Sequence, residues 1–183
     1  MQDFESILQR AQSFVITAGA GMGVDSGLPD FRGTEGFWRA YPPFRKLGLS
    51  FSDLANPRWF RDDPKRAWGF YGHRLDLYRT IRPHEGFHIL LEQLGAKPHW
   101  VFTSNVDGQF QQAGFSADRI VEIHGSIHHL QCSEPCSSSI WGAKGVTVRF
   151  DEETFRWLGP LPLRQKCGAV VRPNILMLSL IHI

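Results

Sequence analysis

The chain has 183 residues, and 42% of them are apolar, which is enough for one hydrophobic core and a small second lobe. The formal net charge is +2, and the lysines and arginines are spread along the chain, so the composition argues against nucleic acid as the main partner. No apolar run approaches the roughly 20 residues that span a bilayer, and the first residues lack a secretory apolar segment, so we expect a cytoplasmic protein that does not enter membranes.

The start of the chain predicts a helix, a strand and a glycine-rich turn, in that order. Apolar residues at helical spacing predict a short amphipathic helix over residues 3–12. The β-rich run at residues 14–17 predicts a buried strand, and glycines crowd the segment directly after it. A buried strand that leads into a glycine-rich turn is typical of a dinucleotide-binding unit. The prolines and glycines of residues 28–50 then predict an ordered loop.

Helices and strands alternate through most of the remaining chain. Residues 57–81 are expected to be helical, with Pro57 and Pro64 in first helical turns, and residues 84–94 predict a second helix that ends at Gly95. Strands are expected at residues 99–103, 120–123 and 174–177. This alternation predicts an α/β fold with a Rossmann-like parallel sheet and helices on both of its faces.

The three cysteines fall in a segment that interrupts this alternation. Residues 126–172 carry Cys132, Cys136 and Cys167 and fit a small inserted lobe. Three is an odd number of cysteines, and in a cytoplasmic setting it indicates metal binding or free thiols rather than a disulfide framework.

One glycine-rich string carries much of the chemical information. It reads GAGMGVDSGLPDFRG and covers residues 19–33. Glycines let backbone amides approach a pyrophosphate without a Cβ atom in the way. Arg32 can pair with a phosphate, and Phe31 can screen a reactive sugar from water. A strand followed by G-x-G would, taken alone, fit a plain glycine turn equally well.

Four strings together resemble the sirtuin family. The glycine-rich string resembles that family's cofactor signature GAGxSxxSGIPDFRG, with Gly23 where the family usually has serine. TSNVDG at residues 103–108 resembles the family's TQNVDGL, with Ser104 in place of glutamine and Gln109 in place of leucine. The sirtuin glutamine reaches the ribose of NAD, whereas a serine is too short to do so directly and would act through a water.

The other two strings lie further along the chain. IHGS at residues 123–126 resembles the catalytic HG of sirtuins, and RPNILM at residues 172–177 resembles the strand that leads out of their zinc lobe. All four strings occur in family order and at family spacing. The resemblance implies an NAD-dependent deacylase that removes acyl groups from acylated lysine in proteins and releases nicotinamide and O-acyl-ADP-ribose.

The resemblance also implies roles for individual residues. His124 would deprotonate a ribose hydroxyl, a task that suits an imidazole because its pKa lies near working pH. Asn105 would contact the nicotinamide ribose and its water, and Asp107 would receive the carboxamide of nicotinamide. The further residues expected to bind the cofactor are Gly19, Ala20, Gly21, Asp30, Phe31, Arg32 and Ser104.

Plainer interpretations of these residues exist. His124 alone would fit a hydrogen-bonded structural histidine. Asn105 and Asp107 alone would fit an Asx turn that caps the next helix. We favour the functional interpretation because the strand-end position and the string agree.

The cysteines resemble the structural zinc site of sirtuins with one ligand missing. Family members hold zinc with two cysteine pairs, whereas this chain has Cys132, Cys136 and Cys167, and Arg164 stands where the fourth cysteine is expected. A tetrahedral thiolate site uses four ligands, and a guanidinium cannot ligate zinc. We therefore expect weak or absent zinc, unless His128 or His129 supplies a fourth ligand.

A tyrosine and an arginine in the predicted helix bear on the choice of acyl group. Tyr71 and Arg74 are three residues apart and therefore share a helix face. Sirtuins that prefer acidic acyl groups carry such a pair, in which the arginine pairs with the acyl carboxylate. The alternative is a buried aromatic ring beside a solvated arginine.

The resemblance divides the chain into parts. The core would comprise about residues 1–38, 84–125 and 172–177, with a helical module at about 39–83 and a cysteine-bearing lobe at about 126–171. Residues 178–183 do not resemble the family, whose members continue further, so we expect a truncated domain. Two other functions stay open: ADP-ribosyl transfer or plain NAD hydrolysis, and a catalytically silent NAD-binding module.

Overall fold

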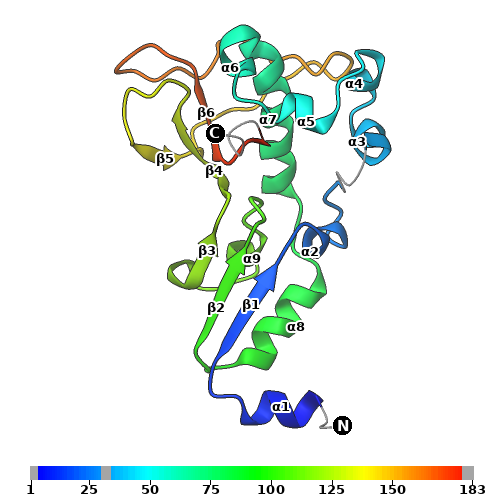
Figure 1. Cartoon of the computed structure of the whole chain (residues 1–183), viewed down its shortest axis with the longest axis vertical. Coiled ribbons are helices and arrows are strands. Elements are labelled where there is room, and N and C mark those ends of the chain that lie inside the picture. The colour runs from blue at the N-terminus through cyan, green and yellow to red at the C-terminus, as the bar shows by residue number, and fades with distance from the viewer. Residues whose placement is uncertain (1–3, 30–33, 179–183) are drawn as a thin grey trace.

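A computed structural model describes residues 4–29 and 34–178, and it contains two three-stranded sheets (Figure 1). The parallel sheet has the order β1-β2-β3, and the antiparallel sheet has the order β5-β4-β6. The strands are β1 (Phe14–Ala18), β2 (His99–Thr103), β3 (Ile120–Glu122), β4 (Gly125–Cys132), β5 (Ile140–Gly142) and β6 (Val171–Ile175).

Short helices connect these strands, and one long helix lies beside the antiparallel sheet (Figure 1). The described helices are α1 (Phe4–Arg10), α2 (Gly21–Val24), α3 (Thr34–Ala40), α4 (Pro42–Lys46), α5 (Phe51–Leu54), α6 (Trp59–Asp62), α7 (Pro64–Thr80), α8 (Glu85–Leu94), α9 (Gln109–Gln112) and the 3₁₀ turn η1 (Ala117–Arg119). Among the described residues, no helix has the length and apolar character to cross a membrane.

The parallel sheet buries one of its faces under α8 and α9. Val101 of β2 is fully buried there, together with Phe87 of α8 and Phe110 of α9. Side chains alternate along a strand, so the residues between the buried ones point to the opposite face. That face carries exposed apolar side chains, including Trp100 and Phe102. In the described part of the chain, α8 and α9 thus cover one face of this sheet while the other face is exposed, so the expectation of helices on both faces is wrong there.

The larger core surrounds α7, whose aromatic residues pack against loops and the antiparallel sheet. Trp68, Phe70 and Tyr71 are all fully buried. The indole N–H of Trp68 donates to the carbonyl of Val171 in β6 at 2.8 Å. These contacts hold the long helix against the cysteine-bearing lobe.

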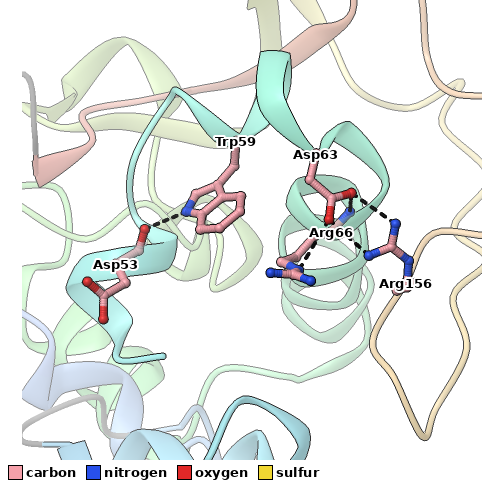
Figure 2. Close-up of polar contacts among 5 residues, drawn as sticks. All are labelled: Asp53, Trp59, Asp63, Arg66 and Arg156. Atoms are coloured by element: carbon pink, nitrogen blue, oxygen red, sulfur yellow. Dashed lines mark hydrogen bonds and ion pairs between the residues drawn. The ribbon is translucent and has the colours of Figure 1, made fainter. Parts of the chain in front are cut away.

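The amino-terminal end of α7 is fixed by a charged cluster (Figure 2). Asp63 caps the helix by accepting a hydrogen bond from the backbone N–H of Arg66 at 3.3 Å. Its two carboxylate oxygens also accept from the guanidinium of Arg156, at 2.9 and 3.0 Å. Nearby, the indole of Trp59 donates to the carbonyl of Asp53 at 2.6 Å. An aspartate at this position is favoured because it satisfies an unpaired helix N–H.

Several expectations from the sequence are confirmed. The parallel sheet of an α/β fold and the small lobe that gathers the cysteines are both present. The first three strands lie within one residue of the predicted ranges. Pro64 is in the first turn of α7, and Gly95 ends α8 with a positive φ of 53°. The boundaries of the three parts of the chain stay a prediction.

Three local expectations are wrong. Residues 28–50 are not simply a loop, because they contain α3 and α4, where aromatic residues that bury in the core stabilise short helices. The helical segment 57–81 is split at Asp63, and Pro57 lies before α6 rather than in its first turn. The fourth strand is β6, which pairs antiparallel with β4 instead of joining the parallel sheet.

Candidate active site at the strand ends

A cavity of about 340 Å³ lies where the carboxyl ends of the parallel strands meet α7. This edge is where open α/β sheets bind their ligands. The cavity is lined by Ala20, Leu28, Pro29, Phe51, Ala55, Tyr71, Arg74, Tyr78, Ser104, Asn105, Val106, Asp107, His124, Ile175, Leu176 and Leu178. Residues predicted from three separate strings of the sequence therefore meet at one cavity.

The glycine-rich turn is tied to the end of β2. The side-chain amide of Asn105 donates to the carbonyl of Gly19 at 3.0 Å, and the hydroxyl of Thr103 donates to the carbonyl of Ala18 at 3.1 Å. Gly21 begins α2 and is not among the residues that line the cavity. The predicted contacts Asp30, Phe31 and Arg32 lie outside the described residues.

Gly23, which stands where sirtuins usually have serine, packs closely against Leu28. A Cβ atom at this position would lie 2.7 Å from Cδ1 of Leu28, which is closer than real Cβ contacts. Leu28 is itself buried and lines the cavity. A serine at position 23 would therefore require the leucine side chain to move.

Asn105 and Asp107 are both buried at the wall of the cavity. One carboxylate oxygen of Asp107 accepts from the backbone N–H of Gln109 at 3.0 Å, which is an Asx turn. Asp107 therefore forms the Asx turn and also lines the cavity, so the structural and the functional interpretations of this residue are compatible. Burial raises the pKa of the Asp107 carboxyl, although the hydrogen bond from Gln109 partly offsets this effect.

His124 lies between β3 and β4, and its half-buried side chain lines the cavity. Its backbone carbonyl accepts from the N–H of Leu176 at 2.8 Å. The next residue, Gly125, has a φ of 74°, and a Cβ atom there would lie 2.1 Å from the carbonyl oxygen of Asn174. The glycine that follows the histidine is therefore required by the close approach of β6.

Tyr71 and Arg74 project from α7 into the wall of the same cavity. Arg74 is only 5% exposed, so the alternative of a solvated arginine is wrong. Its guanidinium donates to the hydroxyl of Tyr78 at 3.0 Å and lies 5.3 to 5.8 Å from the centres of four aromatic rings. Burial raises the pKa of Tyr71 to about 12, despite the opposing charge of Arg74.

The Tyr71 hydroxyl has an unusual position. It is buried, and within the described part of the chain it has no hydrogen-bond partner. A buried hydroxyl without a partner costs free energy, about 1–3 kcal/mol as a general magnitude. Because the residue lines the cavity, a ligand with an acceptor atom could satisfy it.

The three cysteines lie together in the lobe, as predicted. The sulfur of Cys136 is 3.1 Å from that of Cys132 and 3.3 Å from that of Cys167. The guanidinium of Arg164 donates to the sulfur of Cys136 at 3.1 Å and so takes the place of a fourth ligand. Within the described residues, no histidine belongs to this group. The three sulfur atoms lie close enough together to hold a metal ion, but with Arg164 in the fourth place they do not complete a four-thiolate zinc site.

Some residues at the site were not found from the sequence. Tyr78 binds Arg74 and lines the cavity; its position four residues beyond Arg74 on one helix would have indicated it. Gln109 is buried, and its amide oxygen accepts from the hydroxyl of Ser26 at 2.6 Å, which joins the two cofactor strings. No sequence signal pointed to that contact, because the residues are far apart in the chain.

The sequence model of the Sir2 family matches residues 19–179, which is most of the chain. The chain belongs to the Sir2 family. Within the match lie the glycine-rich string, the cavity residues that follow β2 and β3, and the cysteine-bearing lobe. The match therefore covers the antiparallel sheet, the second and third strands of the parallel sheet, and every described residue that lines the cavity, whereas β1 lies just before it.

Similar proteins in the Sir2 family are named deacylases. NAD-dependent protein deacylase 1 of Archaeoglobus fulgidus is 30% identical over 170 residues, which are 92% of this chain and 60% of that protein. NAD-dependent protein deacylase 2 of Pyrobaculum aerophilum is 34% identical over 171 residues, 92% of this chain and 59% of that protein. The chain thus spans about 60% of the length of these curated relatives.

Solved Sir2 structures share the fold. The complex of a Sir2 homologue with NAD superimposes with a TM-score of 0.71 at 27% identity, over 98% of this chain and 63% of that one. A mutant Sir2 homologue in complex with ADP-ribose gives a TM-score of 0.72 at 26% identity, over 98% and 64%. Both likenesses cover nearly all of this chain.

Proposed function

We propose that this chain carries the nicotinamide-side catalytic site of an NAD-dependent protein-lysine deacylase. The observation that carries the proposal is the cavity at the strand ends, which is lined by Asn105, Asp107 and His124 together with three residues of α7. Its volume lies in the range of small-molecule sites, and it combines an apolar wall with a few polar groups. The names of the similar proteins support the same activity.

Each polar residue of the cavity has a defined task in this proposal. NAD, when bound, supplies the electrophilic ribose carbon and the nicotinamide leaving group. Asp107 binds the carboxamide of nicotinamide, because its buried carboxyl oxygens at the cavity wall can accept hydrogen bonds from the N–H groups of the carboxamide. Asn105 orients the ribose, and its own amide is held by Gly19. His124 takes a proton from a ribose hydroxyl.

The release of nicotinamide tests this proposal directly. The purified 183-residue chain is incubated with NAD, with and without an acylated lysine peptide, and free nicotinamide is measured. We expect release that depends on the peptide. Release without peptide would instead indicate NAD hydrolysis or ADP-ribosyl transfer, and no release would indicate a silent module; either result overturns the deacylase proposal.

We further propose that the acyl group preferred is an acidic one, such as succinyl or malonyl. Arg74 brings a positive charge to the cavity wall, in an environment of low dielectric where charge interactions are strong. Tyr71 adds a buried hydroxyl that has no partner in the described part of the chain and can donate to a carboxylate. A charge-assisted contact of this kind contributes about 1.5–3 kcal/mol, or roughly ten- to a hundredfold in relative rate.

Two variants test the acyl preference. Arg74→Met removes the charge, and Tyr71→Phe removes only the hydroxyl while keeping the ring that packs on Phe60 and Phe70. We expect both to lower the ratio of kcat/KM for succinyl over acetyl peptide, Arg74→Met by roughly tenfold or more. A ratio that stays the same in both variants would show that the pair has no part in acyl choice.

A further inference from the structure

Strand β4 contains a bulge that turns one histidine toward the candidate site. Ser126 pairs with Asn174 of β6, and Leu130 pairs with Pro173, the next residue along β6. Residues 127–129 of β4 are therefore inserted between two residues that pair with adjacent residues of β6. Bulges of this kind change the direction of the side chains within them. His128 lies at the centre of this bulge.

The bulge binds the turn that carries Asp107. The backbone N–H of Ile127 donates to the carbonyl of Val106 at 3.0 Å. The ring nitrogen Nε2 of His128 lies 2.8 Å from the carbonyl oxygen of Asp107. A carbonyl can only accept, so Nε2 of His128 carries the hydrogen. Two successive carbonyls of the turn are thus held by two successive residues of β4.

The histidine ring also determines which residue can follow Asp107. Gly108 has a φ of 72°, and a Cβ atom there would lie 2.7 Å from Cδ2 of the His128 ring. The ring therefore covers the turn closely, and only glycine leaves room for it. Burial lowers the pKa of His128, which favours the neutral ring and so the single Nε2 donor described above.

We infer that His128 is a positioning residue for nicotinamide: by holding the backbone of Asp107, it sets the direction of the Asp107 carboxyl at the cavity. This inference rests on the proposed function, in which that carboxyl binds the carboxamide. The string IHGS ends at Ser126, so the sequence resemblance assigned no such task to His128. The cysteine-bearing lobe thereby contributes to the nicotinamide site through β4.

Binding measurements on the full chain separate positioning from a purely structural effect. His128→Leu removes the donor, and His128→Gln restores an N–H at a similar reach from the backbone. His129→Leu is the matched control, because this neighbouring side chain is exposed. The dissociation constants of NAD and of ADP-ribose, which lacks nicotinamide, are measured for each variant by titration calorimetry.

We expect His128→Leu to weaken NAD about tenfold, the size of one lost hydrogen bond, while ADP-ribose changes less than twofold. His128→Gln should recover most of the NAD affinity, and His129→Leu should behave as the wild type. Unchanged NAD affinity in His128→Leu, or an equal loss for both ligands, would overturn the inference. A wild-type chain that binds ADP-ribose but gains nothing from the nicotinamide group would instead overturn the proposed role of Asp107.

Discussion

His124 is followed by a residue that leaves it little freedom. Gly125 cannot be replaced by a residue with a Cβ atom, since that atom would lie 2.1 Å from the carbonyl oxygen of Asn174. The backbone of His124 and Gly125 is thus held by β6 and the residue after it, through the pairing of Gly125 with Ile175 and the hydrogen bond from Leu176 to the His124 carbonyl. A proton acceptor that must meet one hydroxyl benefits from such a fixed position.

We predict that His124→Ala abolishes most deacylation. Loss of a general base typically lowers the rate by about 10²–10⁴. The rate of peptide-dependent nicotinamide release measures the effect, and His88→Ala is a suitable control because His88 is exposed on α8, away from the cavity. Retention of more than half of the wild-type rate in His124→Ala would refute its assignment.

Among the elements, α7 carries Tyr71 and Arg74, the residues proposed to contact the acyl group. Its first turn is capped by Asp63. Burial alone would raise the pKa of this carboxyl, but the hydrogen bonds from Arg156 and from the backbone of Arg66 outweigh it and hold the pKa below its ordinary value of 3.8. A carboxyl whose pKa is lowered by folding stabilises the fold above the unfolded-state pKa. That contribution is lost as the pH falls through the lowered folded-state pKa.

We predict that Asp63→Asn lowers the free energy of unfolding by about 1 kcal/mol at pH 7, since the partly exposed ion pair is screened by solvent. Asparagine still caps a helix, so the change keeps the cap and removes the charge together with one of the two acceptors for Arg156. Urea unfolding at pH 7 and pH 3 should show the difference from wild type shrinking at the lower pH. The exposed neighbour Asp62→Asn is the control; a difference that is equal at both pH values would contradict the prediction.

In the cysteine-bearing lobe, Arg164 lies against the cysteines. Arg164 donates to Cys136 and holds a positive charge where a zinc ligand is expected, so we predict less than one tightly held zinc per purified chain. Arg164→Cys should raise the bound zinc toward one per chain, measured by elemental analysis after dialysis. Arg149→Cys adds a thiol at an exposed position of the same lobe and should not. One tightly bound zinc ion per wild-type chain, or no increase in bound zinc in Arg164→Cys, would show the prediction to be wrong.

In the molecule as a whole, the face of the parallel sheet opposite α8 and α9 carries exposed apolar side chains. Val15, Trp100, Phe102 and Val121 lie on paired or neighbouring strands and form one continuous apolar surface. Val15 is 73% exposed and Trp100 is 51% exposed. Contiguous exposed apolar surface promotes association with other apolar groups.

We predict that the purified 183-residue chain binds an apolar fluorescent dye and self-associates through this surface. The double change Trp100→Lys and Phe102→Lys should reduce both dye binding and the apparent mass in sedimentation. Leu47→Lys, which alters a single exposed leucine after α4, should leave both measurements as they are. If the double variant behaves as the wild type does, this surface is not the site of association.

The sequence by itself determined the elements and the chemistry that depend on neighbouring residues. The strand at β1, the glycine-rich turn, the stop at Gly95 and the pairing of Tyr71 with Arg74 all follow from local spacing. The missing zinc ligand could be predicted from the sequence because Arg164 stands at the position where sirtuins have their fourth cysteine. Periodicity, backbone preference and residue type act over a few positions, so they can be read along the chain.

Only the tertiary structure decided which of these residues meet and how they are held. Two short helices within 34–46 form because their aromatic residues bury in a core made by distant segments. β6 pairs with β4 rather than with the parallel sheet, and the resulting bulge turns His128 onto Asp107. The burial of Arg74 and the contact of Ser26 with Gln109 likewise join residues far apart in the chain. Such contacts depend on long-range packing, which leaves no local pattern in the sequence.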